Sequence, residues 1–207
     1  MTTVRPASVS DRVRAVETLT RAFAADPVVR WFFPDDTTYP DRSRAFFGFL
    51  IDVRLEGGLV LITEDLSAVS SWDPPGGNRL GDAWVDGRWE AATSNFTPEE
   101  LARLDSFEER AAPMHPPDRH WYLGIVGVDP DRWGTGLGRA VIEPGLAAAD
   151  RDGTATYLET GTAENLPIYA RLGLTTSGEV SVPDGPTLWG MWRPADRADP
   201  RRGGDLS

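Results

Sequence analysis

Apolar residues recur along the chain in short runs and at helical spacing, and this pattern predicts alternating strands and helices. Thr97-Pro98-Glu99-Glu100 is the clearest helix start, with a capping threonine, a proline in the first turn and two acids. In chain order, the expected elements are a strand over 3–7, helices over 10–23 and 41–55, strands over 59–63 and 68–72, a helix over 97–113, a strand over 121–128, a helix over 136–150, a strand over 155–159, a helix over 165–172, and strands over 174–182 and 187–193. This order describes one mixed α/β domain.

Three segments fall outside this alternation. Residues 26–34 are aromatic and bounded by prolines, and residues 78–96 show no clean period. The tail, 195–207, is charged and rich in glycine and proline, so we expect it to be disordered. The single domain is therefore expected to span residues 1–194.

A glycine-rich loop joins the expected strand 121–128 to the helix that follows it, with glycines at 134, 136 and 138. Glycines let the backbone approach a ligand closely, and the first N–H groups of a helix lack partners within it. The helix dipole adds about half a positive charge at that end. The loop therefore predicts a phosphate-binding site, and we expect its ligand to be a pyrophosphate.

Two other kinds of phosphate-binding site also use a glycine-rich loop between a strand and a helix. In a dinucleotide fold, an acidic residue follows the glycines by about 20 positions, and Glu159 meets that spacing. However, the loop begins at residue 134 of 207, which leaves too little chain for the parallel strands of that fold. A nucleoside-triphosphate loop needs a lysine, and the chain contains none.

Composition narrows the class of partner. The 207 residues contain 21 Lys+Arg against 32 Asp+Glu, a net charge of -11. Such a surface repels nucleic acid and anionic membranes, whereas it tolerates or attracts a cationic small molecule. Acidity that only serves solubility is the competing explanation.

Several chemistries lack their residues in this sequence. There are no cysteines and 2 histidines, which excludes disulfides and a thiolate nucleophile and leaves no metal-ligand spacing. A serine hydrolase would need Gly-x-Ser-x-Gly, which does not occur. The N-terminus lacks a signal-peptide core and no apolar run approaches ~18 residues, so we expect a cytoplasmic protein.

The element order and its motifs resemble the GCN5-related N-acetyltransferase (GNAT) superfamily, and the last third is similar to its puromycin N-acetyltransferase subfamily. The residues that carry the resemblance are Val128-Asp129-Pro130, the three glycines, Pro144-Gly145, Leu158-Glu159-Thr160, Asn165-Leu166-Pro167, Tyr169, Arg171-Leu172-Gly173, Val182-Pro183-Asp184-Gly185-Pro186 and Trp189. Arg21-Ala22-Phe23-Ala24 and Asp26-Pro27 are also similar. The resemblance covers most of the chain and is tightest over 121–194.

The resemblance implies the GNAT fold, a single mixed sheet flanked by helices. Two parallel strands, 121–128 and 155–159, would splay apart and hold acetyl-CoA. Its pantetheine arm would pair with Ile125, Val126, Gly127 and Val128 as an added strand would. Its pyrophosphate would lie on the N–H groups of the loop residues Trp133, Gly134, Thr135, Gly136, Leu137, Gly138 and Arg139. Trp133 stands where the superfamily has Gln or Arg, and Arg132 and Arg139 are candidates to add positive charge.

The resemblance also implies the acid of the reaction. Tyr169 would lie near the coenzyme sulfur and donate a proton to the leaving thiolate. Asn165, one turn earlier, would begin its helix and bind the pantetheine arm. For the base we consider Glu159, at the end of the second splayed strand, which alternatively holds neighbouring backbone. His120 is a further candidate, ahead of His115.

The acceptor site is expected in the first half, which is rich in large rings. Phe23, Trp31, Phe32, Trp72 and Trp121, with Phe33 and Trp84, are candidates for an aromatic slot that attracts an ammonium by cation–π contact. Since most aromatic residues belong to protein cores, we expect only a few of these to touch substrate.

The sequence therefore predicts an acetyl-CoA-dependent N-acetyltransferase that acts by direct attack on a small primary amine. An aminonucleoside antibiotic is the leading acceptor by resemblance, as in antibiotic resistance. The alternatives are transfer to a protein or peptide N-terminus and a non-catalytic acyl-CoA sensor. We expect a monomer or homodimer with no metal.

Overall fold

One mixed sheet runs through the molecule in the computed structural model, which describes residues 2–77 and 80–195. Its seven strands lie in the order β1-β2-β3-β4-β5-β7-β6. Their bounds are Val4–Pro6 (β1), Leu59–Thr63 (β2), Ala68–Asp73 (β3), His120–Val128 (β4), Ala155–Thr160 (β5), Thr175–Ser181 (β6) and Thr187–Arg193 (β7). Only β4 and β5 are parallel; the other neighbouring strands are antiparallel.

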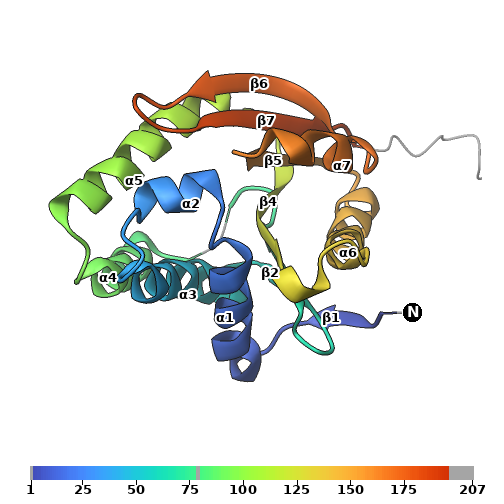
Figure 1. The fold of residues 1–207 in the computed structure, drawn as a ribbon. Coiled ribbons are helices and arrows are strands. Elements are labelled where there is room, and N and C mark those ends of the chain that lie inside the picture. The colour runs from blue at the N-terminus through green and yellow to red at the C-terminus, as the bar shows by residue number, and fades with distance from the viewer. Residues whose placement is uncertain (1, 78–79, 196–207) are drawn as a thin grey trace, which may run out of the picture.

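Helices cover both faces of this sheet. They are Arg12–Ala22 (α1), Pro27–Phe32 (α2), Tyr39–Gly57 (α3), Asp82–Thr93 (α4), Pro98–Ala111 (α5), Leu137–Arg151 (α6) and Leu166–Ala170 (α7). Helix α6 packs on one face, while α1 and α3 pack on the other, and α5 lies beyond α2 (Figure 1). The predicted mixed α/β sheet with two parallel inner strands is confirmed. The tail predicted to be disordered lies, from residue 196 onward, outside the described residues.

The predicted start of α5 shows how local chemistry fixes an element. The Thr97 hydroxyl accepts the N–H of Glu100 at 3.2 Å, and the Glu100 carboxylate accepts the N–H of Thr97 at 2.8 Å. Pro98 occupies the first turn, where its missing N–H costs nothing. This reciprocal capping satisfies two N–H groups that the helix itself leaves unpaired.

Two helices were not predicted from the sequence. Helix α2 lies in the aromatic segment 26–34, where Asp26 caps it by accepting the N–H groups of Val28 and Val29 at 2.9 and 3.0 Å. Helix α4 lies in the segment without a clean period. Only Thr93 of α4 is buried, and the ring of Trp89 meets that of Phe49 of α3 at 5.0 Å. A contact this narrow leaves no apolar stripe in the sequence.

Trp72 ties the sheet to α6 and is fully buried. Its indole N–H donates to the Ser70 hydroxyl at 3.0 Å, which in turn donates to the carbonyl of Val141 in α6 at 2.7 Å. A Cβ added to Gly145 would lie 2.2 Å from the Trp72 ring, so the helix can approach only with a glycine there. Trp72 is thus a core residue, and its predicted contact with substrate is wrong.

Candidate active site

The parallel pair β4–β5 separates soon after it begins. The strands pair at His120, Trp121 and Tyr122 of β4, and the described residues show no pairing between them beyond Tyr122 and Tyr157. Residues 123–128 therefore diverge from β5. In an antiparallel pair, every second residue turns its N–H and C=O away from its partner strand, so β4 offers free groups toward this opening while it pairs with β3 on its other side.

A bulge lies where the splay begins. Ser71 pairs with Ile125 and Trp72 with Leu123, which leaves Gly124 as the extra residue of β4. A Cβ on Gly124 would lie 2.3 Å from a guanidinium nitrogen of Arg54, which is buried and donates to Asp73 at 2.7 Å. The glycine thus admits a buried cation beside the bulge.

The phosphate loop, residues 129–139, follows β4 directly. A 3₁₀ turn (Pro130–Arg132, η3) leads into Gly134 and Gly136, whose φ angles of 75° and 82° favour glycine. Gly136 is the N-cap of α6, so the first N–H groups of this long helix point out of its end. Gly138 has no positive φ, and a Cβ there would make only ordinary contact with Val128 at 3.5 Å. The fold therefore does not require this third glycine.

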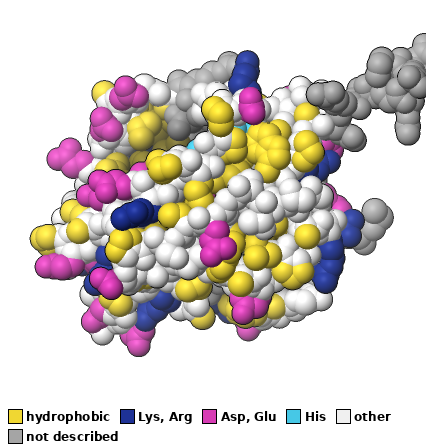
Figure 2. Space-filling model, turned by 90° about the horizontal axis from the view of Figure 1, so that it is seen from above, with side chains coloured by type: hydrophobic (Ala, Val, Ile, Leu, Met, Phe, Trp, Pro, Cys, Tyr) yellow, Lys and Arg dark blue, Asp and Glu magenta, His cyan; other side chains and the backbone are white. Residues whose placement is uncertain are grey.

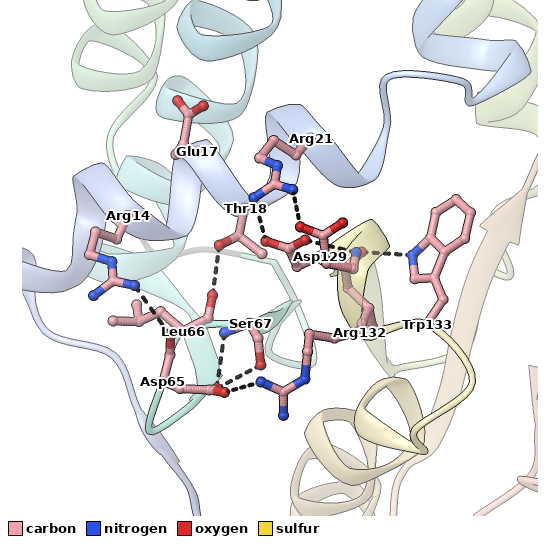
Figure 3. A network of polar contacts seen from close by, with 12 residues as sticks. Arg14, Glu17, Thr18, Arg21, Asp65, Leu66, Ser67, Asp129, Arg132 and Trp133 are labelled. Atoms are coloured by element: carbon pink, nitrogen blue, oxygen red, sulfur yellow. Dashed lines mark hydrogen bonds and ion pairs between the residues drawn. The ribbon is translucent and has the colours of Figure 1, made fainter.

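Ion pairs surround the phosphate loop (Figure 3). Arg132 donates to Asp65 in the β2–β3 turn at 2.9 Å, and Arg21 of α1 donates to Asp129 and Asp131, each at 2.8 Å. Arg139 pairs with Glu143 at 2.6 Å. Since both predicted phosphate-binding arginines already have carboxylate partners, the loop's free attraction for an anion comes from its backbone.

Trp133 differs from the rest of the loop. Its side chain points away from the ion pairs and is 61% exposed (Figure 3). The indole N–H donates to the carbonyl of Val128 at 2.9 Å. The Val128 carbonyl, predicted to help hold pantetheine, is therefore already occupied, while Ile125 and Val126 line the cavity described next.

A cavity of about 560 Å³ opens on the α1–α3 side of the splay. Its walls come from α2, α3 and α5 and from the diverging ends of β4 and β5. The aromatic side chains that line the cavity include Phe23, Phe32, Phe46, Phe47, Phe49, Trp89 and Phe107. Asp105 and Glu108 of α5 also line it. The cavity therefore combines a large apolar surface with negative charge.

Two predicted substrate residues, Phe23 and Phe32, line this cavity, whereas three do not. Besides Trp72 in the core, Trp31 donates its indole N–H to the Asp184 carbonyl at 2.9 Å and packs on the β6–β7 turn. Trp121 lies at the opposite end of β4 and donates to Asp152 at 2.9 Å. Trp31 and Trp121 therefore lie outside this cavity, and their contact with substrate stays a prediction. A tryptophan in the sequence does not reveal which face of the sheet it occupies.

Tyr169 lies on α7, lines the cavity and is 7% exposed. Burial, with a smaller contribution from the charge of Asp26, raises the pKa of its phenol above the usual value. The phenol therefore keeps its proton at neutral pH. Asn165 also lines the cavity and donates to the Thr160 hydroxyl at 3.4 Å, but its side chain does not cap α7.

Glu159 belongs to a cluster with two residues from other elements, which we call the His115 cluster: His115, Tyr122 and Glu159. The Tyr122 hydroxyl donates to one carboxylate oxygen at 2.7 Å, and Nε2 of His115 lies 2.8 Å from the other. The contact with Glu159 raises the pKa of His115 in spite of partial burial. Burial and the charge of Glu159 raise the pKa of Tyr122 well above its usual value, so it remains a donor.

The sequence did not single out Tyr122 or Asp26 as site residues, and it ranked His115 behind His120. His120 lies away from the cavity, with its ring against Tyr157 and Trp192. Asp26 caps α2 and lines the cavity, where burial raises the pKa of its carboxyl. The Asp26-Pro27 pair was the one local signal; nothing near His115 in the sequence indicates Glu159.

These features fit an acyl-CoA. The open edge of β4 suits an extended amide-bearing arm, and the glycine loop at the start of α6 suits a pyrophosphate. Across the described residues there is no cluster of three side chains that would hold a metal ion, and no helix long and apolar enough to cross a membrane.

Comparison with known proteins agrees with this geometry. Residues 98–174 match the model of the acetyltransferase (GNAT) family. A Corynebacterium glutamicum structure, titled histone acetyltransferase HPA2 and related acetyltransferase, is 28% identical, and the match covers 96% of this chain and 98% of that one with a TM-score of 0.71.

Two more distant structures share the fold. Arylalkylamine N-acetyltransferase 2 from Aedes aegypti is 14% identical, with 94% and 99% of the two chains covered and a TM-score of 0.61. The ribosomal-protein-S18-alanine N-acetyltransferase from Escherichia coli is 18% identical, with 100% and 99% covered and a TM-score of 0.54. The family match over residues 98–174 and the fold shared with these structures support a likeness to GNAT acetyltransferases, and together they indicate an N-acetyltransferase.

Proposed function

We propose that this protein transfers acetyl from acetyl-CoA to the primary amine of a small, partly apolar molecule. The observation that carries this proposal is the cavity of about 560 Å³ that leads from the aromatic walls to Tyr169 and Glu159. Ligand cavities for small molecules lie at about 300–1,000 Å³, and a protein N-terminus would be served better by a surface groove.

The charge of the surroundings suits a cationic acceptor. Acidic residues of α5, including Asp105, Glu108 and Glu109, are exposed beside the cavity. Seen from above, acidic side chains gather at the end of the molecule where α4 and α5 lie (Figure 2). An ammonium would be drawn toward this end and then held against aromatic rings.

Each group of residues has its own role in the proposed reaction. The phosphate loop and the edge of β4, including Gly127, would bind acetyl-CoA and orient the thioester. The negative charge of Glu159 would support removal of a proton from the ammonium, and the phenol of Tyr169 would give a proton to the departing sulfur. No covalent enzyme intermediate is needed, because the amine attacks the acetyl carbon directly. The reaction would run in a ternary complex.

The test is release of free thiol from acetyl-CoA with a panel of acceptors. The panel contains puromycin, to which the similarity of the last third points, simple arylalkylamines, an alkylamine without a ring and a short peptide with a free N-terminus. We expect saturable turnover with a ring-bearing small amine and little with the peptide. Preference for the peptide would favour a protein acetyltransferase. Binding of acetyl-CoA by calorimetry without turnover on any amine would favour a sensor.

A further inference from the structure

We propose that the imidazole of His115 takes the proton from the acceptor ammonium, and that Glu159 positions and polarises this ring instead of reaching the substrate itself. The inference rests on the acetyl transfer proposed above. It assigns the role of base to His115, which lies at the end of the 3₁₀ turn Ala112–Met114 (η2), whereas Glu159 lies on a strand.

The side chain of His115 is more accessible than that of Glu159. The Tyr122 hydroxyl donates to one oxygen of Glu159 at 2.7 Å, the other oxygen lies 2.8 Å from His115 Nε2 without a hydrogen bond of good geometry, and the side chain is only 7% exposed. The His115 side chain is 38% exposed, and although Glu159 and Tyr169 line the same cavity, the imidazole is the more accessible of the two candidate bases. A base must come within hydrogen-bond reach of the proton it removes. His115 meets this condition better than the carboxylate behind it.

The contacts of the His115 ring also fix its orientation. A carboxylate beside Nε2 favours the tautomer with its proton on that nitrogen, which leaves the lone pair on Nδ1. The ring is held between two tyrosines, with its centroid 5.3 Å from that of Tyr122 and 5.2 Å from that of Tyr157. Orientation by a carboxylate and by ring packing together gives a fixed acceptor atom.

Titratable groups from three elements face His115. They are Glu159 and Tyr157 of β5, Tyr122 of β4 and Glu108 of α5. The contact with Glu159 raises the pKa of His115 most, the charge of Glu108 adds to it, and partial burial opposes both. The imidazolium formed during the reaction is therefore stabilised where it forms.

The acceptor nitrogen loses two protons in the reaction. The ammonium gives one proton to His115, and its nitrogen then bonds to the acetyl carbon while the carbon–sulfur bond breaks. The sulfur takes the proton of Tyr169, and the second proton lost by the nitrogen restores that phenol. His115 releases its proton to solvent, so the products are the amide, the free thiol and one proton.

The experiment compares the pH dependence of kcat for the wild type and three variants, His115→Gln, Glu159→Gln and His120→Gln. Two acceptor amines of different pKa are used, because an enzyme group gives the same acidic limb with both. His120 is the matched control, since its ring lies away from the cavity against Trp192. Acetyl-CoA binding and thermal melting are measured for each variant.

We expect His115→Gln to lower kcat by about 100-fold and to remove the acidic limb. Glu159→Gln should move that limb to lower pH, and His120→Gln should change neither. A retained limb in His115→Gln, or a limb removed by Glu159→Gln alone, would overturn the proposal. If His115→Gln fails to fold, the proposal is tested by Glu159→Gln alone: a shift of the acidic limb to lower pH supports it, and a shift to higher pH or no shift overturns it. A wild type that acetylates no amine would refute the proposed function, and the base assignment with it.

Discussion

The phosphate loop and the His115 cluster lie at the two ends of one splay, and they offer different parts of the chain to a ligand. At the open end, after Val128, the arginines are bound to carboxylates and the free groups are backbone N–H. Near the closed end, where β4 and β5 still pair at Tyr122, the polar groups are side chains brought together from η2, β4 and β5.

This difference separates binding from chemistry. Backbone groups have no pKa near neutrality, so a loop that uses them binds a phosphate in the same way across a wide pH range. Side chains such as His115 and Tyr169 change protonation, and the contact with Glu159 raises the pKa of His115 while burial raises that of Tyr169. Substitutions at the closed end should therefore act on kcat, and substitutions in the loop on the KM for acetyl-CoA.

The largest effect is expected from Tyr169→Phe. The change removes only the hydroxyl from a buried ring, so packing should survive while the proton donor is lost. We expect kcat to fall about 100-fold, or ~2.7 kcal/mol of barrier. Steady-state kinetics measure this, and calorimetry should show unchanged affinity for acetyl-CoA. Unchanged kcat would remove Tyr169 from the chemistry.

Two glycines of α6, Gly138 and Gly145, are expected to matter for different reasons, the first for ligand binding and the second for helix packing. Gly138→Ala adds a methyl group where the protein makes only ordinary contact, so the fold should be unaffected. If a phosphate lies against this turn, the KM for acetyl-CoA should rise about 10-fold, or ~1.4 kcal/mol. Kinetics with varied acetyl-CoA provide the test.

Gly145→Ala is the matched control on the same helix. Its Cβ would lie 2.2 Å from Trp72, and overpacking of this kind costs about 1–3 kcal/mol against a gain in helix propensity of at most ~1 kcal/mol. We expect its Tm to drop by several degrees, whereas that of Gly138→Ala should not. A lower Tm in Gly138→Ala with normal KM would mean that Gly138 serves the fold.

The open end could be predicted from the sequence because its parts are contiguous. A strand, three glycines and a helix start are adjacent in the chain, and the φ values of Gly134 and Gly136 show why glycine stands there. The order of the strands and of most helices along the chain followed from the same kind of local pattern. Tyr169 and Asn165 were located through resemblance, and the structure places both beside the cavity.

The closed end could not be predicted in the same way. His115 meets Glu159 only because η2 returns to the sheet after α5, and no local pattern encodes that contact. Trp72 illustrates the opposite error. The sequence around it did not determine which face of the sheet its side chain occupies. The hydrogen bond to Ser70 and the close contact with Gly145 place it on the face covered by α6.

A smaller effect is expected from the arginines of the loop. Arg132→Ala and Arg139→Ala should each raise the KM for acetyl-CoA by less than about 3-fold, because both side chains are half-exposed or more and already paired. KM measured at low and high salt tests this. A rise above about 10-fold that vanishes in high salt would show that an arginine leaves its carboxylate for the phosphate.

The smallest effect concerns Asp65, which holds the β2–β3 turn to the phosphate loop. Its carboxylate accepts from the Ser67 hydroxyl at 2.6 Å, the Thr63 hydroxyl at 2.8 Å and Arg132 at 2.9 Å. These contacts, that of Ser67 first, lower the pKa of Asp65 to about 2. Because the folded-state pKa lies below the unfolded value of about 3.9, the carboxylate stabilises the fold above about pH 4, and this contribution fades as the pH falls toward 2.

Asp65→Asn should therefore melt a few degrees below the wild type at pH 7, with a loss of about 1 kcal/mol or less because the side chain is 48% exposed. The difference should shrink as the pH is lowered from about 4 toward 2. Glu143→Gln, which breaks the other arginine pair of the loop within a single helix, serves as the control and should change the Tm less. Equal Tm values for Asp65→Asn and wild type at pH 7 would show that the loop holds its shape without this anchor. Its glycines and the start of α6 alone would then form the binding surface.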